Sequence, residues 1–268
     1  MKKLLILILL FALSACGTSP TGRSQLMLVS PEQAILSSKA AYVQTLQPLQ
    51  KDGKIDSDIA VSKRIQFITG RLIAQAIILY PRTSEWEWSI KVIDDPETVN
   101  AWCMAGGKMA IYTGLIDKTK ATDDEIAQVM GHEISHALAN HTAERMSMAM
   151  ASQVGLMGLA MAVGSNEYGG ALLAGSSAAA AVAITLPNSR TSETEADAIG
   201  IELAARAGYD PKAAASLWQK MGEVGGNGPP EFLSTHPSPN NRKETLTTLA
   251  KEVMPYYLDN SKRPVYQL

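Results

Sequence analysis

The sequence predicts an α+β fold that is mainly helical, with a small β-sheet or hairpin beside one central helix. Three observations predict it. Helical periodicity recurs before and after the middle of the chain. The alternation typical of strands is confined to residues 86–113. Three of the four histidines lie within residues 122–141, a stretch that has the pattern of one helix.

The chain divides into four segments. Residues 1–15 are expected to be a lipoprotein signal peptide, 16–29 a polar tether, 30–254 one folded domain and 255–268 a C-terminal tail. The formal net charge of −2 and the pI near 6.1 show no basic footprint, which argues against nucleic acid as a partner.

The first sixteen residues, MKKLLILILLFALSAC, have the pattern of a leader. Two lysines precede an apolar run at residues 4–13 that is too short to span a bilayer. The ending LSAC resembles the lipobox of bacterial lipoprotein signal peptides, which implies cleavage before Cys16, acylation of Cys16 and a membrane anchor there. Gly17 at the next position points, by the usual sorting rule of such lipoproteins, to an outer-membrane lipoprotein facing the periplasm. An ordinary secretory signal cut nearby is the alternative.

Cysteine usage agrees with this leader. Lipidation would consume Cys16 and leave Cys103 without an intramolecular partner, so no disulfide framework is expected. A chain of 28.7 kDa can build a core without one. Cys103 is expected to be a small buried apolar residue, with a nucleophile as the alternative.

Two helices are predicted before the strands. Ser30 and Gln33 form a capping box that opens the first, with Pro31 at its first position. The second covers about residues 57–79, rich in Ile, Leu and Ala, and stops before Pro81.

Three strands are predicted next. The first is residues 86–93, whose alternation places one set of side chains on one face: Trp86, Trp88, Ile90 and Val92. Residues 100–105 and 108–113 are two further strands, and Gly-Gly between them predicts a hairpin. One arm is expected to be an edge strand that pairs with an extended peptide. The residues assigned to this edge are Asn100, Ala101 and Trp102. Sheet structure without a binding role is the alternative.

The central helix has strong local signals. Thr122 is a good N-cap and Glu125 completes a capping box, while acidic residues in the first turn suit the helix dipole. An apolar face recurs at helical spacing: Ile126, Val129, Met130, Ile134 and Leu138.

His132 and His136 are four residues apart on this helix and project from the same side. Two imidazoles so placed can hold one zinc ion, and Glu133 is left beside the metal. This is the H-E-x-x-H arrangement of a metallopeptidase. The alternative is a helix with two histidines that are hydrogen-bonded in the core or exposed. His141 lies off the His132/His136 face and is expected to be structural.

Residues 146–187 are low in charge and dense in Ala, Gly, Ser and Met. Two apolar pieces, 154–163 and 171–186, are each short for a membrane span. This favours close-packed helices or a mobile flap over a transmembrane hairpin. The methionines are expected to fill core space; an adaptable groove for apolar side chains is the alternative.

A third zinc ligand is expected at 189–206, a helix followed by Gly208. Glu193 and Asp197 are four apart and share a face. Glu193 could bind zinc while Asp197 hydrogen-bonds the distal nitrogen of a zinc-bound imidazole. Glu195 points elsewhere and is expected to be solvated. The alternative is a charged face that pairs with Arg190 or Arg206.

The last signal is Ser-Thr-His-Pro-Ser-Pro at 234–239. Ser238 and Pro239 are expected to begin a final helix that runs to about Val253. His236 lies in the loop before it. It could steady the oxyanion of a tetrahedral intermediate, or occupy the open zinc position in a latent state.

Three motifs in order carry a resemblance: His-Glu-Ile-Ser-His, then Ser-Arg-x-x-Glu-x-Glu-Ala-Asp-x-x-Gly, then Ser-Thr-His-Pro with a later arginine. They resemble the zinc metallopeptidase family of HtpX, BepA, LoiP, the CaaX prenyl protease and the mitochondrial OMA peptidase. The resemblance implies a zincin fold of the gluzincin type, one Zn²⁺ per chain and Glu133 as general base. It implies the zinc ligands His132, His136 and Glu193. It also implies that His236 and Arg242 act near the transition state or gate the metal.

The expected function is therefore zinc-dependent endoproteolysis of unfolded, misfolded or stalled cell-envelope proteins. The last step, the substrate, rests on family analogy. One alternative is an envelope chaperone or assembly lipoprotein with a latent zinc site. Another is a zinc hydrolase that acts on non-peptide bonds.

Overall fold

The computed structural model describes residues 16–163, 189–224, 231–236 and 241–268, and it confirms the predicted mainly helical architecture with small sheets. The strands are β1 (Cys16–Thr18), β2 (Ser24–Leu26), β3 (Ser89–Ile93), β4 (Ala101–Met104) and β5 (Lys108–Tyr112). The first helices are α2 (Pro31–Lys51), α3 (Ile59–Leu79), the 3₁₀ turn η1 (Pro81–Glu85), α4 (Thr113–Thr119) and α5 (Asp123–Leu138). The later helices are α6 (His141–Val163), α8 (Arg190–Arg206), α9 (Ala213–Val224), α10 (Glu231–Thr235) and α11 (Arg242–Leu258).

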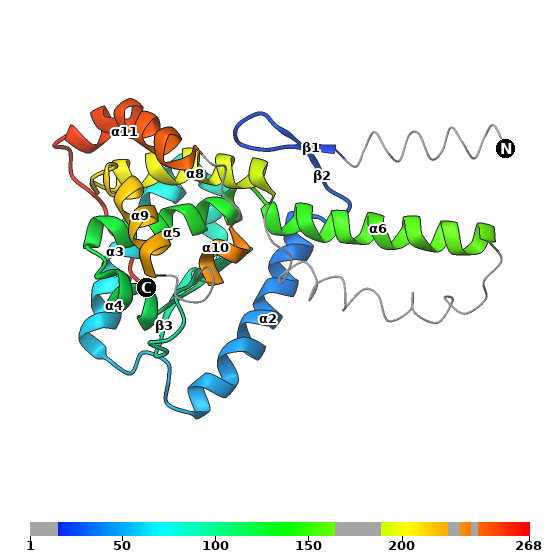
Figure 1. Ribbon diagram of the computed structural model, residues 1–268, viewed down its shortest axis with the longest axis horizontal. Helices are drawn as coiled ribbons and strands as arrows, with labels where there is room; N and C mark the ends of the chain where they lie inside the picture. Colours follow the sequence, from blue (N-terminus) through cyan, green and yellow to red (C-terminus); the bar gives the residue numbers. More distant parts are fainter. Residues whose placement is uncertain (1–15, 164–188, 225–230, 237–240) are drawn as a thin grey trace.

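Helix α5 lies inside the globular body of the molecule (Figure 1). It packs on β4 and is surrounded by α3, α8 and α9, while α11 covers the outer side of α8 and α9. Every residue from Glu125 to Leu138 is buried. The predicted capping box is confirmed, since Thr122 and Glu125 each bond the other's backbone amide. Because this helix is buried on every side, its polar side chains must find partners inside the protein.

The predicted hairpin is confirmed as the antiparallel pair β4–β5, and β3 joins the far side of β5 in parallel. The strand order β3-β5-β4 leaves β4 at an edge of this three-stranded sheet. Gly106 and Gly107 turn the hairpin with φ of 80° and 76°, values that favour glycine. The first strand is shorter than the predicted range 86–93. The indole of Trp88 instead donates to Thr83 in the preceding 3₁₀ turn.

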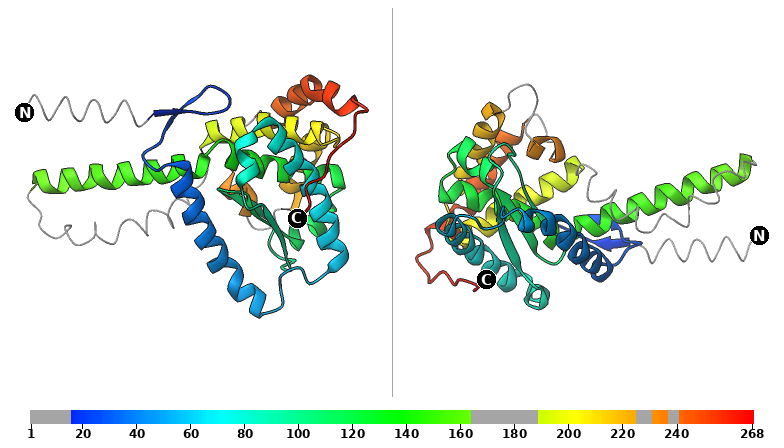
Figure 2. Two further views of the ribbon diagram at one scale, coloured as in Figure 1. Left: turned by 180° about the vertical axis from the view of Figure 1, so that it is seen from behind. Right: turned by 90° about the horizontal axis from the view of Figure 1, so that it is seen from below.

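The segment expected to be a polar tether is structured, which corrects that prediction for residues 16–26. Strands β1 and β2 pair antiparallel, and β2 packs on α6. The short loop between them places Arg23 against Glu144 and Glu195. The physical reason is that this arginine pairs with two carboxylates that lie far away in sequence. In Figures 1 and 2 the hairpin lies beside the base of α6, which projects from the body.

The C-terminal end also differs from expectation. Helix α11 continues to Leu258, past the expected end near Val253, and the following residues return to the domain. Tyr266 donates its amide to the Gly70 carbonyl (2.9 Å), and Arg263 donates to the Arg206 carbonyl (2.6 Å). Residues 255–268 are therefore partly helix and partly packed chain.

Several predictions fall outside the described residues: the leader at 1–15, the apolar piece at 171–186, and the start of the last helix at Ser238 and Pro239. The piece at 154–163 continues α6. Among the helices in the described ranges, none combines the length and the apolar character needed to cross a bilayer.

Helices α5 and α8 approach each other closely through two glycines. A Cβ on Gly200 would lie 2.8 Å from the Cα and amide nitrogen of His132, and one on Gly131 would lie 2.9 Å from the Gly200 carbonyl oxygen. These are backbone atoms, so no side-chain rotation can relieve the contact. The glycines therefore set the spacing that brings α8 carboxylates to α5 histidines.

We expect Gly200→Ala to destabilise the protein. Alanine would gain about 1 kcal/mol in helix propensity, but overpacking against backbone costs about 1–3 kcal/mol, so the steric cost should prevail. Thermal unfolding measures the difference. Gly222→Ala on α9 is the matched control, because its Cβ meets nothing within 4 Å. A Gly200→Ala protein as stable as the Gly222→Ala protein would contradict this account.

Candidate metal centre

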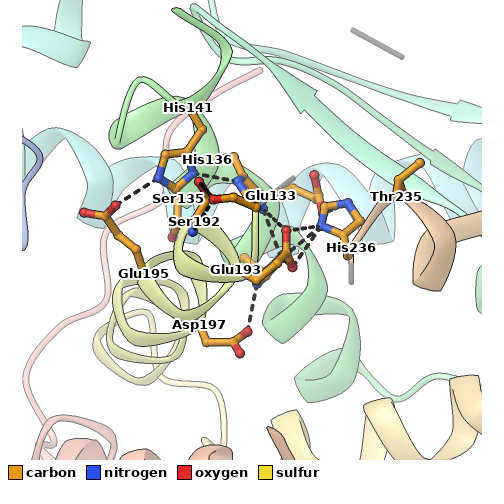
Figure 3. Close-up of polar contacts among 12 residues, drawn as sticks. Glu133, Ser135, His136, His141, Ser192, Glu193, Glu195, Asp197, Thr235 and His236 are labelled. Atoms are coloured by element: carbon orange, nitrogen blue, oxygen red, sulfur yellow. Dashed lines mark hydrogen bonds and ion pairs between the residues drawn. The ribbon is translucent and has the colours of Figure 1, made fainter. Parts of the chain in front are cut away.

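Four buried side chains from three parts of the chain converge beside the C-terminal half of α5. They are His132 and His136 from α5, Glu193 from α8, and His236 just after α10. One ligand atom from each lies within 4.8 Å of the others. Figure 3 shows His136, Glu193 and His236 pointing toward one another. The three residues expected to bind metal are thus together, and His236 joins them.

Their spacing is close to that of a tetrahedral metal site, with each oxygen of Glu193 near one of the two imidazoles. A zinc site with bonds of about 2.0–2.1 Å has ligand atoms about 3.3–3.4 Å apart. His132 Nε2 lies 3.1 Å from His136 Nε2 and 3.2 Å from Glu193 Oε2. His136 Nε2 lies 3.4 Å from Glu193 Oε1. Two imidazoles and one carboxylate are also a donor set that zinc accepts.

The protonation states of these side chains also fit a metal site. His132 Nε2 meets both His136 Nε2 and His236 Nδ1, at 3.1 and 3.3 Å, and a single ring proton can serve only one of these contacts. Burial lowers the pKa of His136 well below its ordinary value, which keeps that imidazole neutral. Burial alone would raise the pKa of Glu193, but hydrogen bonds from His132 and His236 hold it well below its usual range. A neutral His136 beside an ionised Glu193 is the form that binds a cation. Burial lowers the pKa of His132, but hydrogen bonds to Asp197 and Glu193 outweigh this effect and raise it to about 9. A metal bound there would therefore displace a proton from His132.

Asp197 and Arg242 lie behind the cluster. Asp197 Oδ1 is 3.0 Å from His132 Nδ1, the distal-nitrogen contact that the sequence predicts for this residue. Arg242 donates to the same Asp197 oxygen (2.6 Å), contacts Glu193 Oε2 at 3.4 Å and stacks on the ring of Trp218. Because its guanidinium is held by these groups, the geometry favours a positioning role for Arg242 over direct contact with a reacting carbonyl.

The prediction that Glu195 is solvated is wrong. This residue is buried: His141 Nε2 lies 3.0 Å from its carboxylate, and His141 Nδ1 lies 2.7 Å from His136 Nδ1. The helix predicted over residues 122–141 ends at Leu138, and His141 begins α6 instead. His141 is not a member of the metal cluster, as expected, yet it contacts a candidate ligand. The sequence held one signal for the role of His141: the chain has only four histidines, and three of them lie within residues 132–141. In the structure all four are linked by ring contacts.

Glu133 faces a cavity of about 440 Å³ whose wall includes β4, His136, His236 and Arg145. Its Oε1 is buried without a hydrogen-bond partner among the described residues and lies 3.4 Å from His236 Nε2. Burial raises the pKa of Glu133, opposed by the nearby His236 and His132. A carboxylate in this environment is suited to accept a proton near neutral pH.

The predicted peptide edge lines the same cavity. Asn100, Ala101 and Trp102 are all on its wall, with Cys103 and Met104 beyond them. Cys103 is buried, as expected for a small apolar residue, and burial raises its pKa well above the ordinary value. A protonated thiol in that position is a poor nucleophile.

We expect Asp197→Asn to weaken zinc binding by about 10- to 100-fold, because the carboxylate fixes the tautomer and orientation of His132. Competition with a chromophoric chelator measures the affinity. Glu202→Gln is the control on the same helix, since Glu202 pairs with Arg206 near the surface, away from the cluster. Equal zinc affinities in the two variants would remove Asp197 from the metal centre.

Comparison with known proteins agrees with this geometry. Mitochondrial metalloendopeptidase OMA1 of Arabidopsis thaliana is 37% identical over 159 residues, which cover 59% of this chain and 31% of that protein. Metalloendopeptidase OMA1, mitochondrial, of Bos taurus is 31% identical over 263 residues, covering 93% and 49%. Beta-barrel assembly-enhancing protease of Escherichia coli (strain K12) is 30% identical over 173 residues, covering 62% and 35%.

The chain spans about half the length of these relatives or less. The sequence model of Peptidase family M48 matches residues 60–250, a range that includes α5, α8 and His236. On this match, and with its His/His/Glu/His cluster, the chain belongs to peptidase family M48.

Proposed function

We propose that this chain is a zinc-dependent endopeptidase. The observation that carries the proposal is that one cavity is lined by Glu133, by members of the metal cluster and by the edge strand β4. The site thus combines a base, a cluster that can hold a metal and a surface that can align an extended peptide.

Each residue has a role in this proposal. His132, His136 and Glu193 hold zinc, which when bound lowers the pKa of water and polarises the scissile carbonyl. Glu133 takes the proton from the attacking water and passes it to the leaving amine. Asp197 and Arg242 hold His132 and Glu193 in place from behind.

Strand β4 aligns the substrate. As an edge strand over the described residues, β4 can extend the sheet by pairing with a peptide main chain. Its position beside Glu133 brings the paired peptide to the base. Main-chain pairing is tolerant of side chains, which favours varied, unfolded polypeptides as substrates.

His236 holds the site closed. Its Nδ1 lies 3.3 Å from His132 Nε2 and 3.1 Å from Glu193 Oε1, distances like those between the proposed ligands themselves. A catalytic zinc keeps one position open for water. These distances support a latent state, in which His236 would take that position, over a role in oxyanion stabilisation. Activity then requires His236 to withdraw.

We further propose that the substrates are misfolded or stalled proteins of the cell envelope. The LSAC ending at Cys16 supports acylation and an outer-membrane anchor facing the periplasm. Cys16 is exposed at the start of β1. The name of one relative, beta-barrel assembly-enhancing protease, supports an envelope role, whereas other relatives are named as mitochondrial enzymes.

We expect Glu133→Gln to retain zinc and to cleave unfolded casein about 10²- to 10⁴-fold more slowly, because the variant lacks the general base. Zinc content is measured on the same samples as cleavage. Wild-type and variant proteins that both bind zinc and cleave equally would refute the proposal. If neither cleaves but both prevent aggregation of an unfolded protein, a chaperone with a latent zinc site becomes the better account.

We expect His236→Ala to increase casein cleavage at unchanged zinc content. A closed state that leaves about 1–10% of molecules open gives room for a gain of about 10- to 100-fold. Thermal unfolding of the variant verifies that it remains folded, since His236 also stacks on Phe232. A loss of activity with zinc retained would instead assign His236 to the oxyanion.

A further inference from the structure

A continuous series of hydrogen bonds leads from the metal cluster to the N-terminal hairpin. His136 Nδ1 lies 2.7 Å from His141 Nδ1, and His141 Nε2 lies 3.0 Å from Glu195 Oε2. Figure 3 shows these three side chains in a row, away from His236. Both histidines and Glu195 are buried.

Only one set of ring protons fits this series with neutral imidazoles. If His136 Nε2 faces a metal, its proton is on Nδ1 and is donated to His141 Nδ1. His141 then carries its proton on Nε2 and donates it to the Glu195 carboxylate. A metal-bound imidazole is usually oriented by an acceptor on its other nitrogen, and here that acceptor is a second imidazole backed by a carboxylate.

Glu195 is in turn fixed by the loop of the hairpin. Thr21 Oγ1 donates to Glu195 Oε1 (2.6 Å) and Arg23 Nε donates to Oε2 (3.0 Å). The same guanidinium donates two bonds to Glu144 on α6, at 2.6 and 2.7 Å. The guanidinium of Arg23 therefore pairs with two carboxylates, and its several hydrogen bonds fix its orientation.

We propose that the hairpin of residues 16–26 is part of the metal centre: Arg23 and Thr21 hold Glu195, which acts through His141 to orient His136 for the metal. His141, Glu195, Thr21 and Arg23 are positioning residues. The inference rests on the proposed function only in taking His136 as a zinc ligand. It assigns a role to residues that precede the region matching the family, which begins at residue 60.

The test measures zinc affinity of the full chain by competition with a chelator, without reference to cleavage. We expect His141→Ala to bind zinc about 10- to 100-fold more weakly, and Arg23→Ala to weaken it less. The double variant should match His141→Ala, because Arg23 acts through His141. His141→Gln should recover much of the affinity, since its amide can accept from His136 and donate to Glu195. With Co²⁺ in place of zinc, the visible absorption bands of His141→Ala should shift.

Two controls separate this role from general stability. Lys39→Ala breaks an exposed ion pair with Glu87 far from the cluster and should leave zinc affinity unchanged. Thr21→Val removes only one hydrogen bond to Glu195, so it tests the hairpin if Arg23→Ala fails to fold. Thermal unfolding of each metal-free protein reports on folding alone.

A His141→Ala protein that binds zinc as tightly as wild type would overturn the inference. So would a double variant in which Arg23→Ala lowers the zinc affinity of the His141→Ala protein by as much as it lowers that of wild type. These results are independent of the peptidase proposal. If the zinc affinities follow the expected order while the Glu133→Gln variant cleaves like wild type, that result would support the role of the hairpin in the metal centre and refute the peptidase mechanism. A wild-type chain that binds no zinc would overturn both.

Discussion

The structure depends on how one central helix accommodates its buried ionisable side chains, above all the three at residues 132–136. His132, Glu133 and His136 lie on α5, where every residue from Glu125 to Leu138 is buried. Buried polar and charged groups are costly unless they are paired. The surrounding elements supply partners for the two histidines: Asp197 for one distal nitrogen and His141 for the other. Glu133 Oε1 has none among the described residues, and it faces the cavity.

Helix α8 is the main source of these partners, and its close approach to α5 makes them effective. Gly200 lets its backbone lie against His132. Three acidic residues spaced two apart then serve different groups: Glu193 faces the cluster, Asp197 faces His132 from behind, and Glu195 turns to His141. One helix therefore contributes a candidate ligand and supports for both imidazoles.

The proposed closure by His236 and the proposed role of the hairpin in the metal centre concern opposite sides of the same cluster. His236 faces Glu133 and the cavity. His141 contacts His136 and, through Glu195, is linked to the hairpin. One side is suited to open and close around a substrate. The other is held by hydrogen bonds that are at least partly buried, and those to Glu195 and Glu144 are charge-assisted, which makes them stronger than neutral ones. On these two proposals, access to the cluster would change while the geometry of the ligands is maintained.

Sequence alone determined α5, its capping box and the spacing of His132 and His136, because these depend on residues within two turns of one helix. It also determined the β4–β5 hairpin, which two glycines set locally. Tertiary structure decided that Glu195 is buried and that residues 16–26 are ordered. It also decided that His236 lies at the fourth position of the cluster. The physical reason is that each depends on partners more than forty residues away, as with Arg23 and Glu195 at a separation of 172. No local pattern in the chain encodes those distances.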